Sequence, residues 1–137
     1  MSADHRPEGR IVVYQAEDRG GRIRVLLEGE TVWLTQALMA ELFQTTPQNI
    51  TMHLAAIYAE GELAEPATCK EYLQVRTEGR RQVERTLKHY NLEAILAVGY
   101  RVQSPRGTQF RKWATARLAG HPPPRPAARR EEGAAQN

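Results

Sequence analysis

The segment from Thr46 to His53 carries the side chains of this chain that are best suited to recognising another molecule through hydrogen bonds. Gln48 and Asn49 are adjacent, and an amide side chain presents a donor and an acceptor together, which is the pattern that pairs bidentately with adenine. We expect Gln48, Asn49 and Thr51 to reach the edges of base pairs. Thr46 and His53 would touch the sugar-phosphate backbone. The complete set of candidates on this segment is Thr46, Gln48, Asn49, Thr51, Met52 and His53.

Two short helices joined by a polar turn would position these side chains. Thr35 can cap the first helix, whose apolar residues recur at spacings of three and four, as on one buried face. After the break at Gln44, Thr46 offers a second N-cap, and Pro47 suits the first position of a helix that ends at Ala59. The core-facing positions are Leu38, Met39, Leu42, Phe43, Ile50, Leu54, Ile57 and Tyr58. The pattern predicts a helix-turn-helix, and a plain helical hairpin inside a core is the alternative.

Segments that favour β-structure surround these helices. Before them, β-branched and aromatic residues predict strands at 11–14, 22–27 and 31–34. After them, Lys70 to Tyr90 predicts a β-hairpin whose charged tip, 76–81, contains a glycine. A hairpin directly after a helix-turn-helix is the wing of a winged-helix domain, and its arginines would hold phosphates or enter a minor groove. These are Arg76, Arg80 and Arg81; the alternative is an exposed hairpin without a ligand.

Two more helices are expected after the hairpin. Asn91 can cap a helix from Leu92 to Gly99, and an amphipathic pattern predicts another from Thr108 to Leu118. Ser104 to Gly107 forms a turn between them. Basic residues around this turn would make a second phosphate-facing patch, if they are not simply solvated. They are Arg101, Arg106, Arg111 and Lys112, and Arg106 is counted with the DNA-binding candidates.

Length and charge are consistent with one domain that has a polyanionic partner. The chain has 137 residues, and 41% of them are hydrophobic, enough for a single core. Residues 1–65 carry 5 basic and 10 acidic residues (net −5), whereas residues 66–137 carry 14 and 6 (net +8). A basic second half suits nucleic acid, because each neutralised phosphate releases counterions. The predicted recognition helix itself contains no Lys or Arg, so attraction to phosphates must come from elsewhere.

Several other classes of protein are not indicated. The sequence has no phosphate-binding glycine loop, no His-Glu-x-x-His and no Gly-x-Ser-x-Gly, so we expect no catalysis and no cofactor. The four histidines and Cys69 show no metal-ligand spacing, so no metal site is expected. A single cysteine excludes an internal disulfide and fits a reducing cytoplasm. No apolar run is long enough for a transmembrane helix, and the first ten residues are polar, so a cytoplasmic location is expected.

Three phrases of the sequence are specific enough to indicate a family. In this order they are TVWLTQALMAELFQTTPQNITMHLAAIYAEGEL, KHYNLEAILAVGYRV and RGTQFRKWATARL. They resemble the virulence protein RhuM family over about Val12 to Leu118. The resemblance implies a bacterial protein that is encoded in a mobile-element or genomic-island setting. The chain looks like the N-terminal module of such a protein. The segment from Tyr90 to Trp113 is also similar to the N-terminal domains of phage antirepressors, which implies a DNA-linked role by analogy.

The sequence therefore predicts an α+β fold: a winged helix-turn-helix domain with an N-terminal β-hairpin and two C-terminal helices. We expect a disordered N-terminus at 1–10, the domain at 11–119 and a disordered Pro/Ala/Arg-rich tail at 120–137. The predicted function is that of a non-catalytic DNA-binding or regulatory module of a mobile-element or virulence-associated protein. Its partner would be double-stranded DNA, with a homodimer or a protein partner also open. The alternative is a protein-interaction or adaptor module without DNA binding.

Overall fold

The computed structural model describes residues 9–16 and 21–120, apart from the side chain of Arg76. Most of the predicted N-terminal and C-terminal disordered segments, and most of the turn at 17–21, lie outside the described residues. Within the described part of the chain, the strands form one antiparallel sheet in the order β1-β2-β3-β5-β4. The strands are β1 (Arg10–Gln15), β2 (Arg22–Glu28), β3 (Thr31–Leu34), β4 (Cys69–Glu78) and β5 (Arg81–Asn91). The α+β class predicted from the sequence is confirmed.

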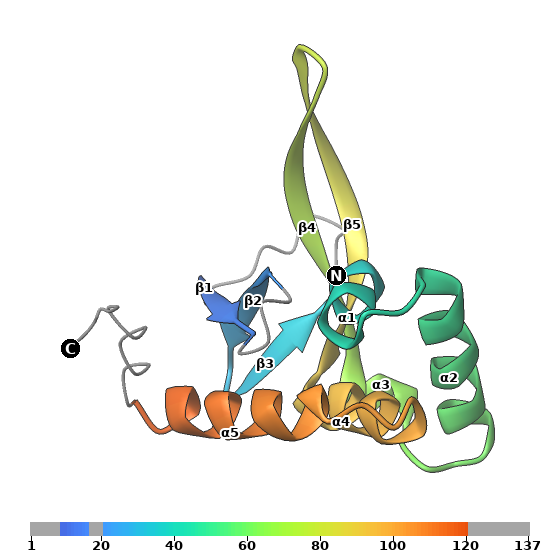
Figure 1. The fold of residues 1–137 in the computed structure, drawn as a ribbon. Helices are drawn as coiled ribbons and strands as arrows, with labels where there is room; N and C mark the ends of the chain where they lie inside the picture. Colours follow the sequence, from blue (N-terminus) through green and yellow to red (C-terminus); the bar gives the residue numbers. More distant parts are fainter. Residues whose placement is uncertain (1–8, 17–20, 121–137) are drawn as a thin grey trace.

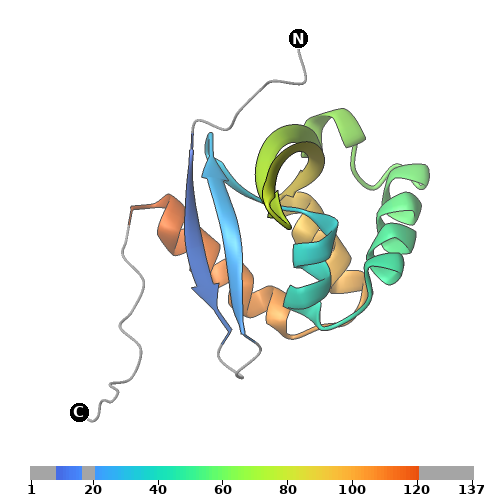
Figure 2. The ribbon, with the colours of Figure 1, turned by 90° about the horizontal axis from the view of Figure 1, so that it is seen from above.

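Helices cover one face of this sheet (Figures 1 and 2). They are α1 (Gln36–Phe43), α2 (Pro47–Ala59), the short α3 (Glu65–Thr68), α4 (Leu92–Arg101) and α5 (Arg106–Leu118). The alternation of β2 explains the covered face, because Ile23 and Val25 are buried whereas Arg22 and Arg24 are exposed. The covered core joins β-sheet residues such as Leu34 and Tyr90 to the apolar faces of the helices.

The three predicted N-caps are confirmed. The side chains of Thr35, Thr46 and Asn91 accept hydrogen bonds from the backbone N–H groups of Leu38, Asn49 and Ala94, at 3.2, 3.1 and 3.1 Å. Gln44 ends α1 in the left-handed region with φ 57°, the conformation that glycine more often supplies there. The chain then turns through Thr45 and enters α2 at Pro47, the predicted residue.

The paired strands of the β4–β5 hairpin are longer, and its turn has fewer residues, than the sequence indicates. Its strands pair from Cys69↔Tyr90 to Glu78↔Arg81, so the turn consists of Gly79 and Arg80 and not of residues 76–81. Gly79 has φ 65°, which glycine adopts without steric cost. β5 pairs with β3 through only Trp33↔Asn91 and Leu34↔Tyr90. The rest of the hairpin therefore extends beyond the sheet, as Figure 1 shows.

A small aromatic cluster fixes the base of the hairpin on the sheet face opposite the helices. Leu26, Trp33 and Tyr72 are buried together there. The rings of Trp33 and Tyr72 meet edge to face at 5.7 Å, and those of Tyr72 and His89 at 5.3 Å. Glu28 ties the cluster to β2: its carboxylate accepts from the Tyr72 hydroxyl at 3.1 Å, and its carbonyl accepts from Trp33 Nε1 at 3.0 Å. Burial and the nearby Glu28 raise the pKa of Tyr72 to about 12, so this hydroxyl remains a donor at neutral pH.

The C-terminal helices differ from the prediction at their facing ends. α4 continues to Arg101, beyond the predicted end at Gly99, and α5 begins at Arg106, two residues before the predicted start. Gly99 and Gly107 allow the two helices to approach each other and the buried ring of Phe43 on α1. Among the described residues, no helix is long and apolar enough to cross a membrane.

Replacing Gly99 by alanine should destabilise the fold, whereas the same change at Gly107 should not. A methyl group at Gly99 would lie 2.9 Å from Phe43 Cζ, but one at Gly107 would meet its nearest neighbour at an ordinary 3.7 Å. Overpacking at Gly99 costs about 1–3 kcal/mol. The higher helix propensity of alanine stabilises either variant by up to about 1 kcal/mol. Because the propensity gain applies to both variants, we expect G99A to be less stable than G107A by about 1–3 kcal/mol in urea unfolding. Equal stabilities would show that Phe43 moves aside freely.

His89 should make the fold less stable in mild acid. Its side chain is buried, and this desolvation lowers its pKa below the ordinary value, although Nδ1 lies 2.9 Å from the Leu87 carbonyl. Above a pH of about 6.5 the residue is neutral in both states; as the pH falls below that value, the unfolded chain takes up a proton that the folded chain resists. The free energy of unfolding should therefore fall less between about pH 7.5 and pH 5.5 in H89Q than in the unmodified protein. Identical pH profiles would contradict this role.

Candidate nucleic-acid interface

The outer face of α2 is polar, as the sequence predicts. Ile50, Leu54 and Ile57 are buried, so the opposite side of the helix faces solvent. Gln48 and Thr51 are exposed, and Met52 retains 57% of its exposure. Asn49 and His53 are half-buried. The six candidate side chains from Thr46 to His53 therefore come from the turn and the first two turns of one helix, on its accessible side.

Internal hydrogen bonds distinguish Gln48 from Asn49. The Asn49 amide donates from Nδ2 to Thr45 Oγ1 at 2.9 Å, which fixes the orientation of that side chain and leaves its Oδ1 available. Thr46 is engaged as the cap of the helix. Gln48 makes no side-chain hydrogen bond to any other residue that the structure describes. Of the two amides, that of Gln48 is the one able to present both a donor and an acceptor to a ligand.

Gln36, which the sequence analysis did not single out, links α2 to the hairpin. Thr51 Oγ1 lies 2.8 Å from Gln36 Oε1 and 3.0 Å from the Pro47 carbonyl, and donates to them. Gln36 Nε2 in turn donates to the Tyr90 hydroxyl at 3.2 Å. Burial raises the pKa of Tyr90 to about 12, so the hydroxyl keeps its proton. This chain of side chains runs from the exposed face of α2 through α1 to β5, and sequence spacing offers no signal for it.

The end of the hairpin carries the exposed positive charge. Arg80 and Arg81 are exposed at the turn, and within the described part of the chain neither has an ion pair. Glu78 is opposite Arg81, but its carboxylate accepts two hydrogen bonds of 3.0 Å from Arg85. These bonds raise the pKa of the Arg85 guanidinium. The side chain of Arg76, the third predicted arginine of the tip, lies outside the described residues; its backbone pairs with Val83 in the strand and not in the turn.

Of the second basic patch predicted around the α4–α5 turn, Arg111 and Lys112 are exposed, whereas Arg106 and Arg101 are engaged within the protein. Arg106 lies in the first turn of α5, where it is 4% exposed, and its Nη1 donates to the Glu41 carbonyl at 3.5 Å near the end of α1. Arg101 is held by Glu60 at 2.6 Å and by Glu62 at 3.1 Å. Because Arg106 packs against the end of α1, its side chain points into the protein and cannot face a phosphate in this arrangement.

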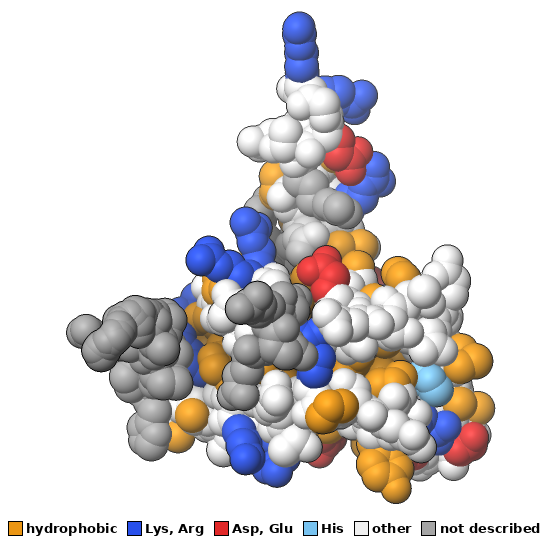
Figure 3. Space-filling view, in the orientation of Figure 1, with side chains coloured by type: hydrophobic (Ala, Val, Ile, Leu, Met, Phe, Trp, Pro, Cys, Tyr) orange, Lys and Arg blue, Asp and Glu red, His pale blue; other side chains and the backbone are white. Residues whose placement is uncertain are grey.

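The polar face of α2 and the charged hairpin end lie on the same side of the molecule. In Figure 1, α2 begins at the end of the domain from which the hairpin rises, next to α1. Figure 3 shows Lys and Arg side chains at the end of the hairpin and a mostly uncharged surface over the α1–α2 end. The arrangement separates hydrogen-bonding groups on a helix from positive charge on a projecting hairpin.

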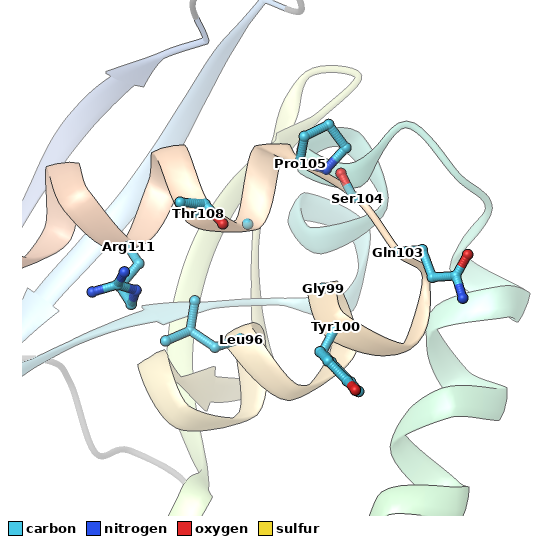
Figure 4. Close-up of a pocket in the computed structure, with 9 residues that line it drawn as sticks. Leu96, Gly99, Tyr100, Gln103, Ser104, Pro105, Thr108 and Arg111 are labelled. Atoms are coloured by element: carbon cyan, nitrogen blue, oxygen red, sulfur yellow. The ribbon is translucent and has the colours of Figure 1, made fainter.

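A shallow apolar hollow lies elsewhere, between α4 and the start of α5. It encloses about 520 Å³, and its lining includes Leu96, Tyr100, Pro105 and Arg111, drawn in Figure 4. Tyr100, at the edge of the hollow, is 84% exposed. No cluster of three or more His, Cys, Asp or Glu side chains that could hold a metal ion occurs among the described residues.

Comparison with known proteins supports the family resemblance. A family model described as the virulence protein RhuM family matches residues 67–121. The match covers β4, β5, α4 and α5, and so includes both the hairpin and the close packing of α4 against α5. No curated protein and no solved structure matches the chain. Over residues 67–121 the chain is similar to the virulence protein RhuM family.

Proposed function

We propose that this domain binds double-stranded DNA as a winged helix-turn-helix, with α2 in the major groove and the β4–β5 hairpin as a wing on the phosphates. The observation that carries the proposal is the exposed amide-bearing face of α2 beside a hairpin that ends in Arg80 and Arg81, which form no ion pair with any described residue. An α-helix fits the major groove, and amide side chains are suited to its base edges. Arginines on a hairpin suit the phosphate backbone or the minor groove.

The strand order supports this interpretation. β3 precedes α1, and β5 follows α2, yet the two strands pair. This pairing brings the hairpin back beside the two helices, where helix and hairpin can touch one duplex together. A hairpin elsewhere on the domain would have left α2, which has no Lys or Arg, without a nearby source of phosphate attraction.

The candidate residues would make different kinds of contact with the duplex. Gln48 would read a base edge with both halves of its amide, and Asn49 would accept through Oδ1. Thr51 would be held in place by Gln36, and Met52 would offer apolar contact to a thymine methyl group. Thr46 and His53 would touch the backbone. Arg106 is buried and would take no part in binding.

The domain would act without catalysis or cofactor, in the cytoplasm, as a regulatory module of a mobile-element or virulence-associated protein. A protein-adaptor role is the second candidate, and the hollow between α4 and α5 favours it through the exposed ring of Tyr100. The two roles differ in salt response. DNA binding weakens steeply with salt, whereas an apolar protein interface does not.

The amide variants test sequence reading. Binding of the purified chain to a pool of random duplex DNA should enrich a sequence, and Q48A should relax the preference at one or two positions of that sequence. The expected loss on the preferred site is about 1–3 kcal/mol, with little change on unrelated DNA. N49A should have a similar effect and also lose the bond to Thr45. Enrichment of the same sequence by Q48A and by the unmodified protein would contradict base reading by Gln48.

The wing variants test phosphate contact. Replacing Arg80 and Arg81 by alanine should weaken binding to all sequences alike, because phosphate contacts carry no direct sequence information. The slope of log affinity against log salt should become shallower by about 1.8, or about 0.9 for each phosphate lost. Titration of one preferred and one unrelated duplex across a salt series measures both quantities. No binding by the unmodified chain at low salt would remove the DNA proposal and leave the adaptor role.

A further inference from the structure

Two arginines on the open face of the sheet, Arg22 and Arg24, are not part of the interface formed by α2 and the hairpin end. Arg22 and Arg24 alternate with the buried Ile23 and Val25 on β2, so their side chains leave the sheet on the face opposite the helices. Both are exposed. Residues two apart in a strand lie about 6.6 Å apart on one face, so the two guanidinium groups can meet different phosphates.

Among the residues that the structure describes, those next to these arginines carry little negative charge. Their cross-strand neighbours on β1 are Gln15 opposite Arg22 and Val13 opposite Arg24, and neither carries a carboxylate. Within the described part of the chain, no ion pair involves Arg22 or Arg24. The carboxylate further along β2, that of Glu28, accepts a hydrogen bond from Tyr72. The two guanidinium groups are therefore available to a ligand, and their charge complements an anion.

The open face of β2 is on the same side of the molecule as the hairpin. Arg22 and Arg24 point away from the sheet face that the helices cover, and Lys70, at the base of the hairpin, lies over the ring of Trp33 on that outer face. Figure 3 shows Lys and Arg side chains over β1 and β2, near the foot of the hairpin, and Figure 2 places these strands beside it. In Figures 1 and 2, β1 and β2 lie on one side of the hairpin and α2 on the other, so this third positive surface would meet a duplex beyond the segment that α2 reads.

We propose that Arg22 and Arg24 contact the sugar-phosphate backbone of the bound duplex, outside the segment that α2 reads. This inference rests on the proposed function and extends it, because it adds a β-sheet contact to the helix and the wing. Arginine suits the contact, since its planar guanidinium binds phosphate oxygens bidentately. The occupant is DNA and not a protein strand, because the two guanidinium groups on this face complement a phosphate backbone and have no carboxylate opposite them.

The test compares two double variants with the same loss of charge. R22A/R24A removes the proposed contact, and R111A/K112A removes two exposed charges from α5, on the helical side of the domain. We expect the salt slope to become shallower by about 1.8 in R22A/R24A and to stay unchanged in R111A/K112A. Hydroxyl-radical footprinting should show that R22A/R24A loses protection at one flank of the site while the enriched sequence stays the same.

Each outcome separates this inference from the proposed function. If the unmodified chain binds no DNA, the proposed function fails, and this inference fails with it. If the chain selects a sequence but R22A/R24A keeps its slope and footprint, only the β-sheet contact is wrong. Equal losses in both double variants would also overturn it, because they would reflect net charge alone. R22K/R24K should keep the salt slope, and unchanged urea midpoints in all variants would show that folding is not the cause.

Discussion

The pairing of β3 with β5 is the constraint on which the arrangement of the proposed interface depends. Only Trp33↔Asn91 and Leu34↔Tyr90 form it, yet these two pairs join the strand before α1 to the strand after the hairpin turn. Each of the four paired residues also makes a second interaction, which strengthens the connection between β3 and β5. Leu34 and Tyr90 enter the core, Asn91 caps α4, and Trp33 packs on Tyr72. A short ladder can therefore set the position of a long hairpin, because the side chains on both faces of the sheet are buried around it.

The same joint explains how a projecting hairpin keeps a defined direction. A two-stranded ribbon alone is marginally stable in water, so its base must be held by other contacts. On one face the Tyr90 hydroxyl meets Gln36, which also accepts from Thr51 on α2. On the other face Tyr72 and His89 pack beside Trp33, and Glu28 accepts from Tyr72. Burial keeps the hydroxyl of Tyr90 protonated on the first face, since it raises the pKa of Tyr90, and keeps His89 neutral on the second, since it lowers the pKa of His89.

Local features were the part that the sequence could predict. N-caps at Thr35, Thr46 and Asn91, the bounds of α2 and the presence of a hairpin all follow from spacing and residue type within a few positions. What the sequence could not supply depends on contacts between distant residues. Arg106 resembles a surface arginine in a turn, and only the approach of α1 makes it a buried donor to Glu41. Gln36 lies 54 residues from Tyr90 and 15 from Thr51, so no local pattern marks it as the link between α2 and β5. The length of the hairpin was also hidden, because residues 76–78 suit a charged turn as well as a strand.

The distribution of charge would assign phosphate attraction and base recognition to different elements of the proposed interface. A recognition helix rich in Lys or Arg would hold any phosphate backbone, and its base contacts would add little to discrimination between sequences. Here α2 carries no Lys or Arg, whereas exposed arginines lie on the hairpin end and on the open face of β2. Attraction to a duplex would then come from surfaces that cannot read bases, and a wrong sequence under α2 would leave polar amides without partners, which costs binding energy. Affinity and selectivity would thus rest on different elements of one domain, joined by β3 and β5.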